Sequence, residues 1–72
     1  MTLDQLKATQ CATVLGIDLP FEVRERLAAL GVKVGRHLAV VHRLGPRGPM
    51  QVRAGRTDFI LRAREAAGIR IG

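Results

Sequence analysis

Apolar and polar residues alternate over several short stretches of the chain, a period typical of half-buried β-strands. The clearest stretch is 50–54, where Met50, Val52 and Ala54 point one way and the polar residues between them point the other. A run of β-branched and small residues predicts a strand over 9–17, with Ala12 and Val14 on one face. Further strands are predicted over 37–44, 57–62 and 69–71. Glycine-containing turns separate the middle strands, at 45–49 and 55–56.

One segment has a helical period instead. Between residues 21 and 30, Val23, Leu27 and Leu30 recur at i, i+4 and i+7, with charged residues between them. Pro20 suits the first helical turn, and Gly31 is the expected left-handed residue after the last turn. The pattern predicts one amphipathic α-helix at about residues 20–30. A short helical turn is expected near the C-terminus, at 63–67.

The predicted order of elements is strand, helix, three-stranded meander, helical turn and strand. A flat sheet of five short strands would leave one face exposed, whereas curling into a barrel covers the core and protects the edges. We therefore expect a mainly β fold, a small barrel of about five strands with the helix at one end. Phe21 and Phe59 both fall in apolar patterns and are expected in the core.

Length and composition narrow the class of protein. A chain of 72 residues and 7.8 kDa allows one small domain, spanning 1–72. Its single cysteine excludes an internal disulfide and a four-cysteine zinc site, which favours a reducing, cytoplasmic location. No apolar run approaches the roughly 20 residues that a membrane span needs.

Residues that could carry out catalysis are few and scattered. The chain has no serine, and Cys11 is its only thiol. His37 and His42 are five residues apart in one predicted strand, so we expect them on opposite faces, where they cannot share a metal ion. The glycine–proline turn lacks the Lys-Ser/Thr ending of a phosphate-binding loop. The sequence predicts no catalytic residue, no cofactor and no metal site.

The charge of the chain points to acidic partners. Twelve basic residues against six acidic ones give a net charge of +6. Six arginines belong to the predicted meander and its turns: Arg43, Arg47, Arg53, Arg56, Arg62 and Arg64. If the barrel closes, several of them are expected to share one flank. Such a flank is either a docking face for an acidic partner or simply solvating charge. An RNA- or DNA-binding barrel is the alternative function, although only two aromatic residues are present for stacking on bases.

An ordered set of motifs resembles the ferrous iron transport protein A (FeoA) family. In the first half these are Leu3-Asp4-Gln5-Leu6, Ala12-x-Val14, Arg26-Leu27-x-x-Leu30-Gly31 and Gly35. In the second half they are the turn from Gly45 to Pro49, Met50-x-Val52, Gly55, Phe59-x-Leu61-Arg62 and Glu65-Ala66-x-x-Ile69-x-Ile71. The resemblance covers nearly the whole chain in order. It departs at Thr9, where the family usually has glycine, and at the turn Gly48-Pro49, which is one residue shorter.

The resemblance implies an SH3-like β-barrel and a role in bacterial uptake of Fe(II). It further implies contact with the ferrous iron permease and its cytoplasmic GTP-binding domain, and it supplies no catalytic residues. No small-molecule substrate is expected. A carrier of ferrous iron is a third possibility, disfavoured by the lone thiol and the separated histidines. Open edges of a small barrel would also allow weak self-association into a homo-oligomer.

The surface expected to bind the partner combines the end of the helix, the loop after it and the arginine flank. An exposed Val32 beside Lys33 and Arg36 would give an apolar anchor surrounded by charge. The alternative is that Val32 and Val34 close the end of the barrel, Val34 in preference to Val32. The candidate contact residues are Leu30, Val32, Lys33, Arg36, Arg53 and Arg56.

Overall fold

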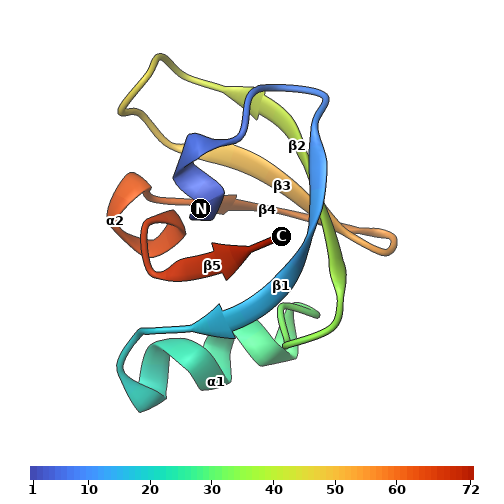
Figure 1. Ribbon diagram of the computed structural model, residues 1–72, viewed down its shortest axis with the longest axis vertical. Helices are drawn as coiled ribbons and strands as arrows, with labels where there is room; N and C mark the ends of the chain where they lie inside the picture. The colour runs from blue at the N-terminus through green and yellow to red at the C-terminus, as the bar shows by residue number, and fades with distance from the viewer.

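Five antiparallel strands form one strongly curved sheet in the computed structural model, which describes residues 1–72 (Figure 1). In chain order the elements are η1 (Leu3–Gln5), β1 (Cys11–Ile17), α1 (Phe21–Ala29), β2 (His37–Arg43), β3 (Met50–Ala54), β4 (Thr57–Leu61), α2 (Ala63–Ala66) and β5 (Ile69–Ile71). The strands lie in the order β4-β3-β2-β1-β5. The predicted mainly β fold with one long helix and a C-terminal helical turn is confirmed.

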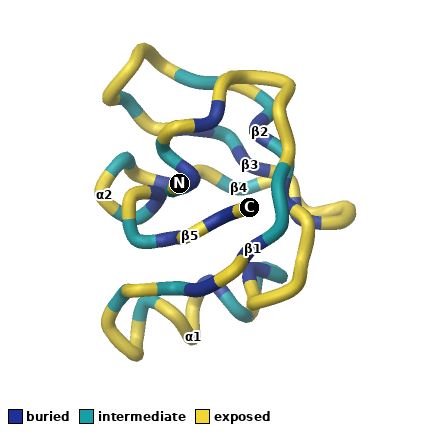
Figure 2. The backbone as a smooth tube through the Cα atoms, in the orientation of Figure 1, coloured by how far each residue is buried: buried dark blue, intermediate teal, exposed yellow.

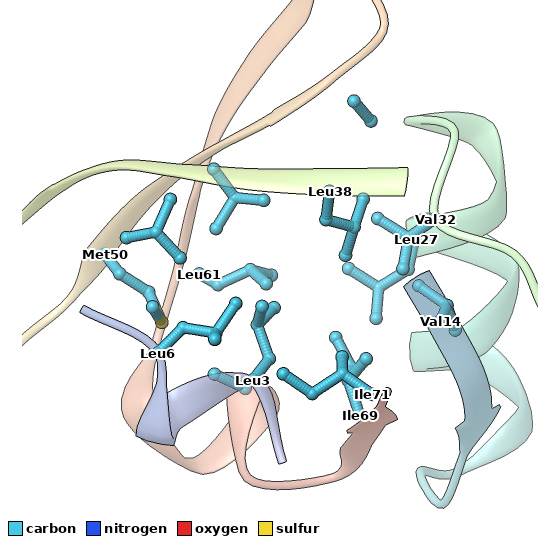
Figure 3. Close-up of a cluster of buried hydrophobic side chains, with 14 residues drawn as sticks. Leu3, Leu6, Val14, Leu27, Val32, Leu38, Met50, Leu61, Ile69 and Ile71 are labelled. Atoms are coloured by element: carbon cyan, nitrogen blue, oxygen red, sulfur yellow. The ribbon is translucent and has the colours of Figure 1, made fainter. Parts of the chain in front are cut away.

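The inner face of the sheet carries the apolar side chains that the alternation singled out. Met50, Val52 and Ala54 of β3 are all buried, and Val14 of β1 is buried with them. Figure 3 shows this cluster, and Figure 2 marks the buried positions along the backbone. The 14 buried apolar residues form one core: Leu3, Leu6, Val14, Leu27, Val32, Leu38, Val40, Met50, Val52, Ala54, Leu61, Ala66, Ile69 and Ile71.

The two aromatic residues have different environments. Phe59 is partly buried and packs against the core, as predicted. Phe21 is 64% exposed, so its predicted core position is wrong. Phe21 is the first residue of α1 and precedes Val23 by two positions, which places it about 200° around the helix from the side that faces the sheet. The apolar pattern was correct for the helix, but it did not extend to the helix's first residue.

Two strands contain irregularities that alter which residues share a face. In β1 the register with β5 shifts between Val14 and Gly16, and a glycine within a strand is typical of such a bulge. In β2 the register with β3 shifts between Val40 and His42. Thr9, just before β1, has a φ of 73°, in the left-handed region, where glycine is the residue without steric cost. This backbone geometry explains why glycine is usual there in the family that the sequence resembles.

The N-terminal segment, too short for its period to decide a structure, folds as η1 and covers the core. Leu3 and Leu6 are buried, and Figure 3 shows both beside Met50 and Leu61. The Arg43 guanidinium of β2 holds the segment in place by donating hydrogen bonds to the carbonyl oxygens of Asp4 and Leu6. None of the helices has the length and apolar character needed to span a membrane.

Candidate functional site

The titratable side chains do not assemble a metal or catalytic cluster. No group of three or more His, Cys, Asp and Glu side chains is placed to hold a metal ion. His37 and His42 lie on the same, outer face of the sheet, contrary to the prediction, because the bulge in β2 shifts the alternation between them. They are still about 15 Å apart along the strand. The Thr13 hydroxyl is 2.9 Å from His37 Nδ1, and Cys11 is exposed.

Three of the carboxylates are paired with arginines rather than with one another. Asp58 of β4 accepts two hydrogen bonds from the Arg53 guanidinium of β3, at 2.7 and 2.9 Å. Glu65 of α2 forms an ion pair with Arg26 of α1. Asp18 and Arg70 form a third pair at 2.8 Å. Two of the pairs join two elements, and the third joins β5 to Asp18 in the loop between β1 and α1. Exposed ion pairs of this kind contribute little to stability, and these three carboxylates are each engaged by an arginine rather than by a second carboxyl group.

Two of these pairs shift the pKa of their carboxyl group. The hydrogen bond from Arg53 lowers the pKa of Asp58 and raises the pKa of Arg53. Burial alone would raise the pKa of Glu65, but the backbone N–H of Arg62 and the charge of Arg26 more than offset it, and the pKa is lowered. Both carboxylates are therefore ionised at neutral pH.

These shifts predict a loss of stability in acid. A carboxyl whose pKa is lower in the folded state stabilises that state above its unfolded pKa, near 4, and the contribution disappears as the pH falls through the folded pKa. We expect the free energy of unfolding, measured with urea at pH 2 to 6, to fall below pH 4. The slope of this free energy against pH should correspond to a difference of at most about two bound protons between the folded and unfolded states. Asp58→Asn should flatten this slope, whereas Glu22→Gln, at an exposed site without an ion-pair partner, should not. An unchanged slope in Asp58→Asn would contradict the prediction.

The end of α1 has a hydrogen-bond pattern that fixes Val32 in the core. Leu30 caps the helix, and Gly31 follows with a φ of 98°. The N–H of Gly31 donates to Ala28 O at 3.0 Å, and the N–H of Val32 donates to Leu27 O at 2.9 Å. This is a Schellman motif, in which the residue after the glycine folds back onto the last helical turn. Figure 3 shows Val32 against Leu27.

The predicted roles of Val32 and Val34 are therefore reversed. Val32 is 0% exposed and belongs to the core, so its prediction as an exposed anchor is wrong. Val34 is 66% exposed at the tip of a turn closed by a 3.1 Å hydrogen bond from Arg36 N–H to Lys33 O. Two further bonds tie this loop to β1: Gly35 N–H donates to Val14 O at 2.8 Å, and Val14 N–H donates to Arg36 O at 2.9 Å. The loop thus presents Val34 from a fixed backbone.

Arg36 brings the loop and the β3–β4 hairpin together. A Cβ atom placed on Gly31 would lie 3.8 Å from Arg36 Nη2, and one placed on Gly55 would lie 3.6 Å from the same atom. The guanidinium therefore lies between the end of α1 and the hairpin turn, near the helix C-terminus, where a cation is favoured. We call this surface the basic end; its members are Leu30, Lys33, Val34, Arg36, Arg53 and Arg56. Five of these residues come from the predicted contact set, whose role in binding stays a prediction, and Val34 takes the place of the buried Val32.

The arginines of the meander are spread along β4 rather than gathered at one point. Arg53 and Arg56 lie at the hairpin, and the five residues of β4, about 17 Å long, separate them from Arg62 and Arg64. Arg43 is engaged with the N-terminal segment instead. Arg43 is therefore not available to a shared flank, because its guanidinium binds carbonyl oxygens of the chain itself.

A groove lies between α1 and the segment formed by β4 and α2. One hollow of about 420 Å³ is lined by Leu27, Leu30, Ile60 and Leu61 together with charged residues. A second hollow of about 390 Å³ continues along Leu19, Pro20 and Val23. The two hollows share Arg26, Arg62 and Glu65 and so form one groove. The sequence reasoning missed this groove, because its walls come together only when the sheet curls.

Comparison with known proteins agrees with the resemblance found in the sequence. A family model described as the FeoA domain matches residues 1–71. No curated protein matches the chain. A FeoA protein from Chlorobium tepidum has a solved structure that is 32% identical with a TM-score of 0.91, covering 99% of this chain and 68% of that one.

Two further structures have the same fold. The FeoA protein of Stenotrophomonas maltophilia, solved in complex with zinc and described as a procaryotic SH3 domain protein, is 30% identical with a TM-score of 0.85. The match covers 100% of this chain and 89% of that one. A manganese-dependent transcriptional repressor is 21% identical with a TM-score of 0.86, and the match covers 99% of this chain and 40% of the repressor. At that identity the repressor shows a shared fold only.

Proposed function

Because the chain belongs to the FeoA family, which is linked to ferrous iron transport, we propose that it is a cytoplasmic, non-enzymatic accessory protein that acts by binding the ferrous iron permease. The partner segment is the permease's cytoplasmic GTP-binding domain. The relative from Stenotrophomonas maltophilia is described as a candidate activating factor of ferrous iron transport, which supports a regulatory role of this kind.

The basic end is the observation that carries the proposal. It combines an exposed apolar side chain, Val34, with three cations that have no carboxylate within ion-pair distance: Lys33, Arg36 and Arg56. Arginine is enriched in protein-binding hot spots, and an apolar contact within a polar rim is the general anatomy of a protein interface. Its backbone is fixed by hydrogen bonds to β1, so little conformational entropy is lost on binding. Arg53 is also a member of the basic end, but its charge is largely taken by Asp58.

Charge reversal at the basic end tests the proposal. We expect Lys33→Glu/Arg36→Glu/Arg56→Glu to weaken binding to the isolated GTP-binding domain by at least about tenfold, since each reversed charge replaces attraction by repulsion. The control is Lys7→Glu/Arg24→Glu/Arg47→Glu, which changes the net charge equally at exposed sites outside the basic end. Binding is measured by titration calorimetry with GDP, with a non-hydrolysable GTP analogue and without nucleotide.

The outcomes separate the choice of partner from the choice of surface. Equal loss in both triple variants would show that only net charge matters and that the basic end is not the contact. Absence of binding by the wild-type chain in every nucleotide state would overturn the proposed partner. Val34→Ser gives an independent check, because it removes the apolar anchor without changing the charge.

Nucleic-acid binding gains no specific support from the arrangement of charges. Three arginines already hold carboxylates: Arg26, Arg53 and Arg70. The basic end offers no aromatic ring on which a base could stack, since Phe59 packs against the core and Phe21 begins the other end of α1. Protein contact therefore accounts better for the exposed surface.

A further inference from the structure

The two ends of the sheet differ in whether their edges are covered. The edge of β5 is occupied by the N-terminus: Ile71 N–H donates to Met1 O at 3.0 Å, and Thr2 forms a β-bridge with Arg70. β4, at the other end of the sheet order, pairs only with β3 (Figure 1). β4 is therefore the open edge of the sheet.

The hairpin register identifies which backbone groups are free on β4. Ala54 and Thr57 close a two-residue turn, so they form a hydrogen-bonded pair. Hydrogen-bonded pairs alternate along an antiparallel ladder, so Val52–Phe59 and Met50–Leu61 are hydrogen-bonded pairs too. The N–H and C=O groups of the intervening residues, Asp58 and Ile60, must then point away from β3. No hydrogen bond outside the regular ladders involves the backbone of either residue. Together they offer two donors and two acceptors to an added strand.

The residues around this edge favour the binding of a peptide segment that is apolar in its centre and acidic at its ends. Ile60 is 62% exposed and lines the groove that runs between α1 and β4. Arg56 precedes β4 and Arg62 follows it, so a cation flanks each end of the strand. The groove beyond Arg62 carries a further cation, Arg64, and its only acidic residue is Glu65, which already pairs with Arg26. The apolar centre and the flanking positive charge define the complementary ligand.

We propose that β4 binds an extended peptide segment as a sixth strand, with apolar residues over Ile60 and acidic residues at both ends, next to Arg56 and Arg62. Main-chain hydrogen bonds to Asp58 and Ile60 give this mode its affinity, and the arginines give it selectivity for acidic sequences. The proposal concerns the chemistry of the ligand and does not depend on the permease being the partner.

A second copy of the chain fits this edge less well than an acidic segment does. Antiparallel pairing of two β4 strands would place Arg56 of each copy beside Arg62 of the other, at both ends of the new ladder. Like charges placed opposite each other in a sheet are destabilising. The charge pattern therefore works against self-association through β4 while attracting an acidic peptide.

A synthetic peptide with a valine-rich centre and glutamates at both ends tests the proposal on the full chain. Titration of the isotope-labelled protein, followed by NMR at about 150 mM salt, should shift the amide signals of Asp58 and Ile60 and slow their hydrogen exchange. Arg62→Glu/Arg64→Glu should weaken the binding by about tenfold or more. The matched control is Arg24→Glu/Arg47→Glu, which changes the charge equally away from β4.

Two control peptides separate strand addition from simple charge attraction. A peptide of the same sequence with N-methyl groups on alternate amides keeps its charge but cannot complete the ladder, and should not bind. A peptide with lysine in place of glutamate should not bind either. Equal binding of the methylated peptide, signal changes that avoid β4, or no binding at millimolar peptide would overturn the proposal. Concentration-dependent dimerisation through β4 would also overturn it, since the occupant would then be a second copy.

Discussion

Replacing Val32 with aspartate is expected to leave the chain unfolded at 25 °C, while the same change at Val34 leaves the fold intact. Val32 is fully buried against Leu27, so its replacement would put an unpaired carboxylate into the core at a cost of several kcal/mol. A domain of 72 residues has a total stability of only roughly 4–11 kcal/mol. Val34 is exposed, and changes at such sites are usually worth within about 0.5 kcal/mol.

Circular dichroism and the NMR amide spectrum distinguish these outcomes directly. Val32→Ala is a milder substitution that can be used if the aspartate variant cannot be purified. We expect it to lower the free energy of unfolding, measured with urea, by about 2–3 kcal/mol, because apolar contacts are lost and a cavity is left behind. A folded Val32→Asp protein, or equal effects at the two valines, would show that the Schellman motif at the end of α1 does not place these side chains as described. This pair of variants also separates folding from binding, because only Val34 is available to a partner.

Replacing Arg43 with methionine is expected to lower the free energy of unfolding by about 2–4 kcal/mol, since hydrogen bonds to a charged donor are each worth up to about 3 kcal/mol and do not add fully. The Arg43 guanidinium donates to the carbonyl oxygens of Asp4 and Leu6 and, at 3.0 Å, to Pro46 O. It thereby joins η1 to β2 and to the turn before β3. Methionine keeps the length of the side chain and removes all its donors, so those carbonyl groups lose their partner.

The thermal midpoint of Arg43→Met should fall by about 10–25 °C for a domain of this size. Arg47→Met is the matched control: it removes an exposed arginine of the same turn that has no ion-pair partner, and it should change stability little. Hydrogen exchange should be accelerated first at the amides of Gln5 and Leu6, which close η1. An equal loss in both variants would indicate a general effect of charge and would contradict the specific role of Arg43.

Local patterns account for most of the elements. β3 and β5 have the predicted limits, and α1 begins directly after Pro20 and ends within one residue of its predicted end. The sequence also contains a signal for the burial of Val32. Leu27 and Val32 stand on either side of a helix-ending glycine at the spacing of a Schellman motif, and that spacing predicts their contact.

Other features of the fold cannot be predicted from the pattern of neighbouring residues. The role of Arg43 depends on residues about forty positions away in the chain, which reach it only when η1 folds over the core. The face on which His42 lies depends on a bulge in β2, and alternation within the strand cannot show where the register shifts. The groove beside β4 is made by α1 and α2, which meet through the ion pair of Arg26 with Glu65.

By itself, the sequence determined the strands, the helix, most of the apolar positions and the family, because period, turn residues and motif order are properties of neighbouring positions. Only the tertiary structure decided which valine is exposed, which arginines keep a free charge and which strand edge stays open. These are relations between residues distant in the chain, set by the curvature of the sheet and by which end of it the N-terminal segment covers.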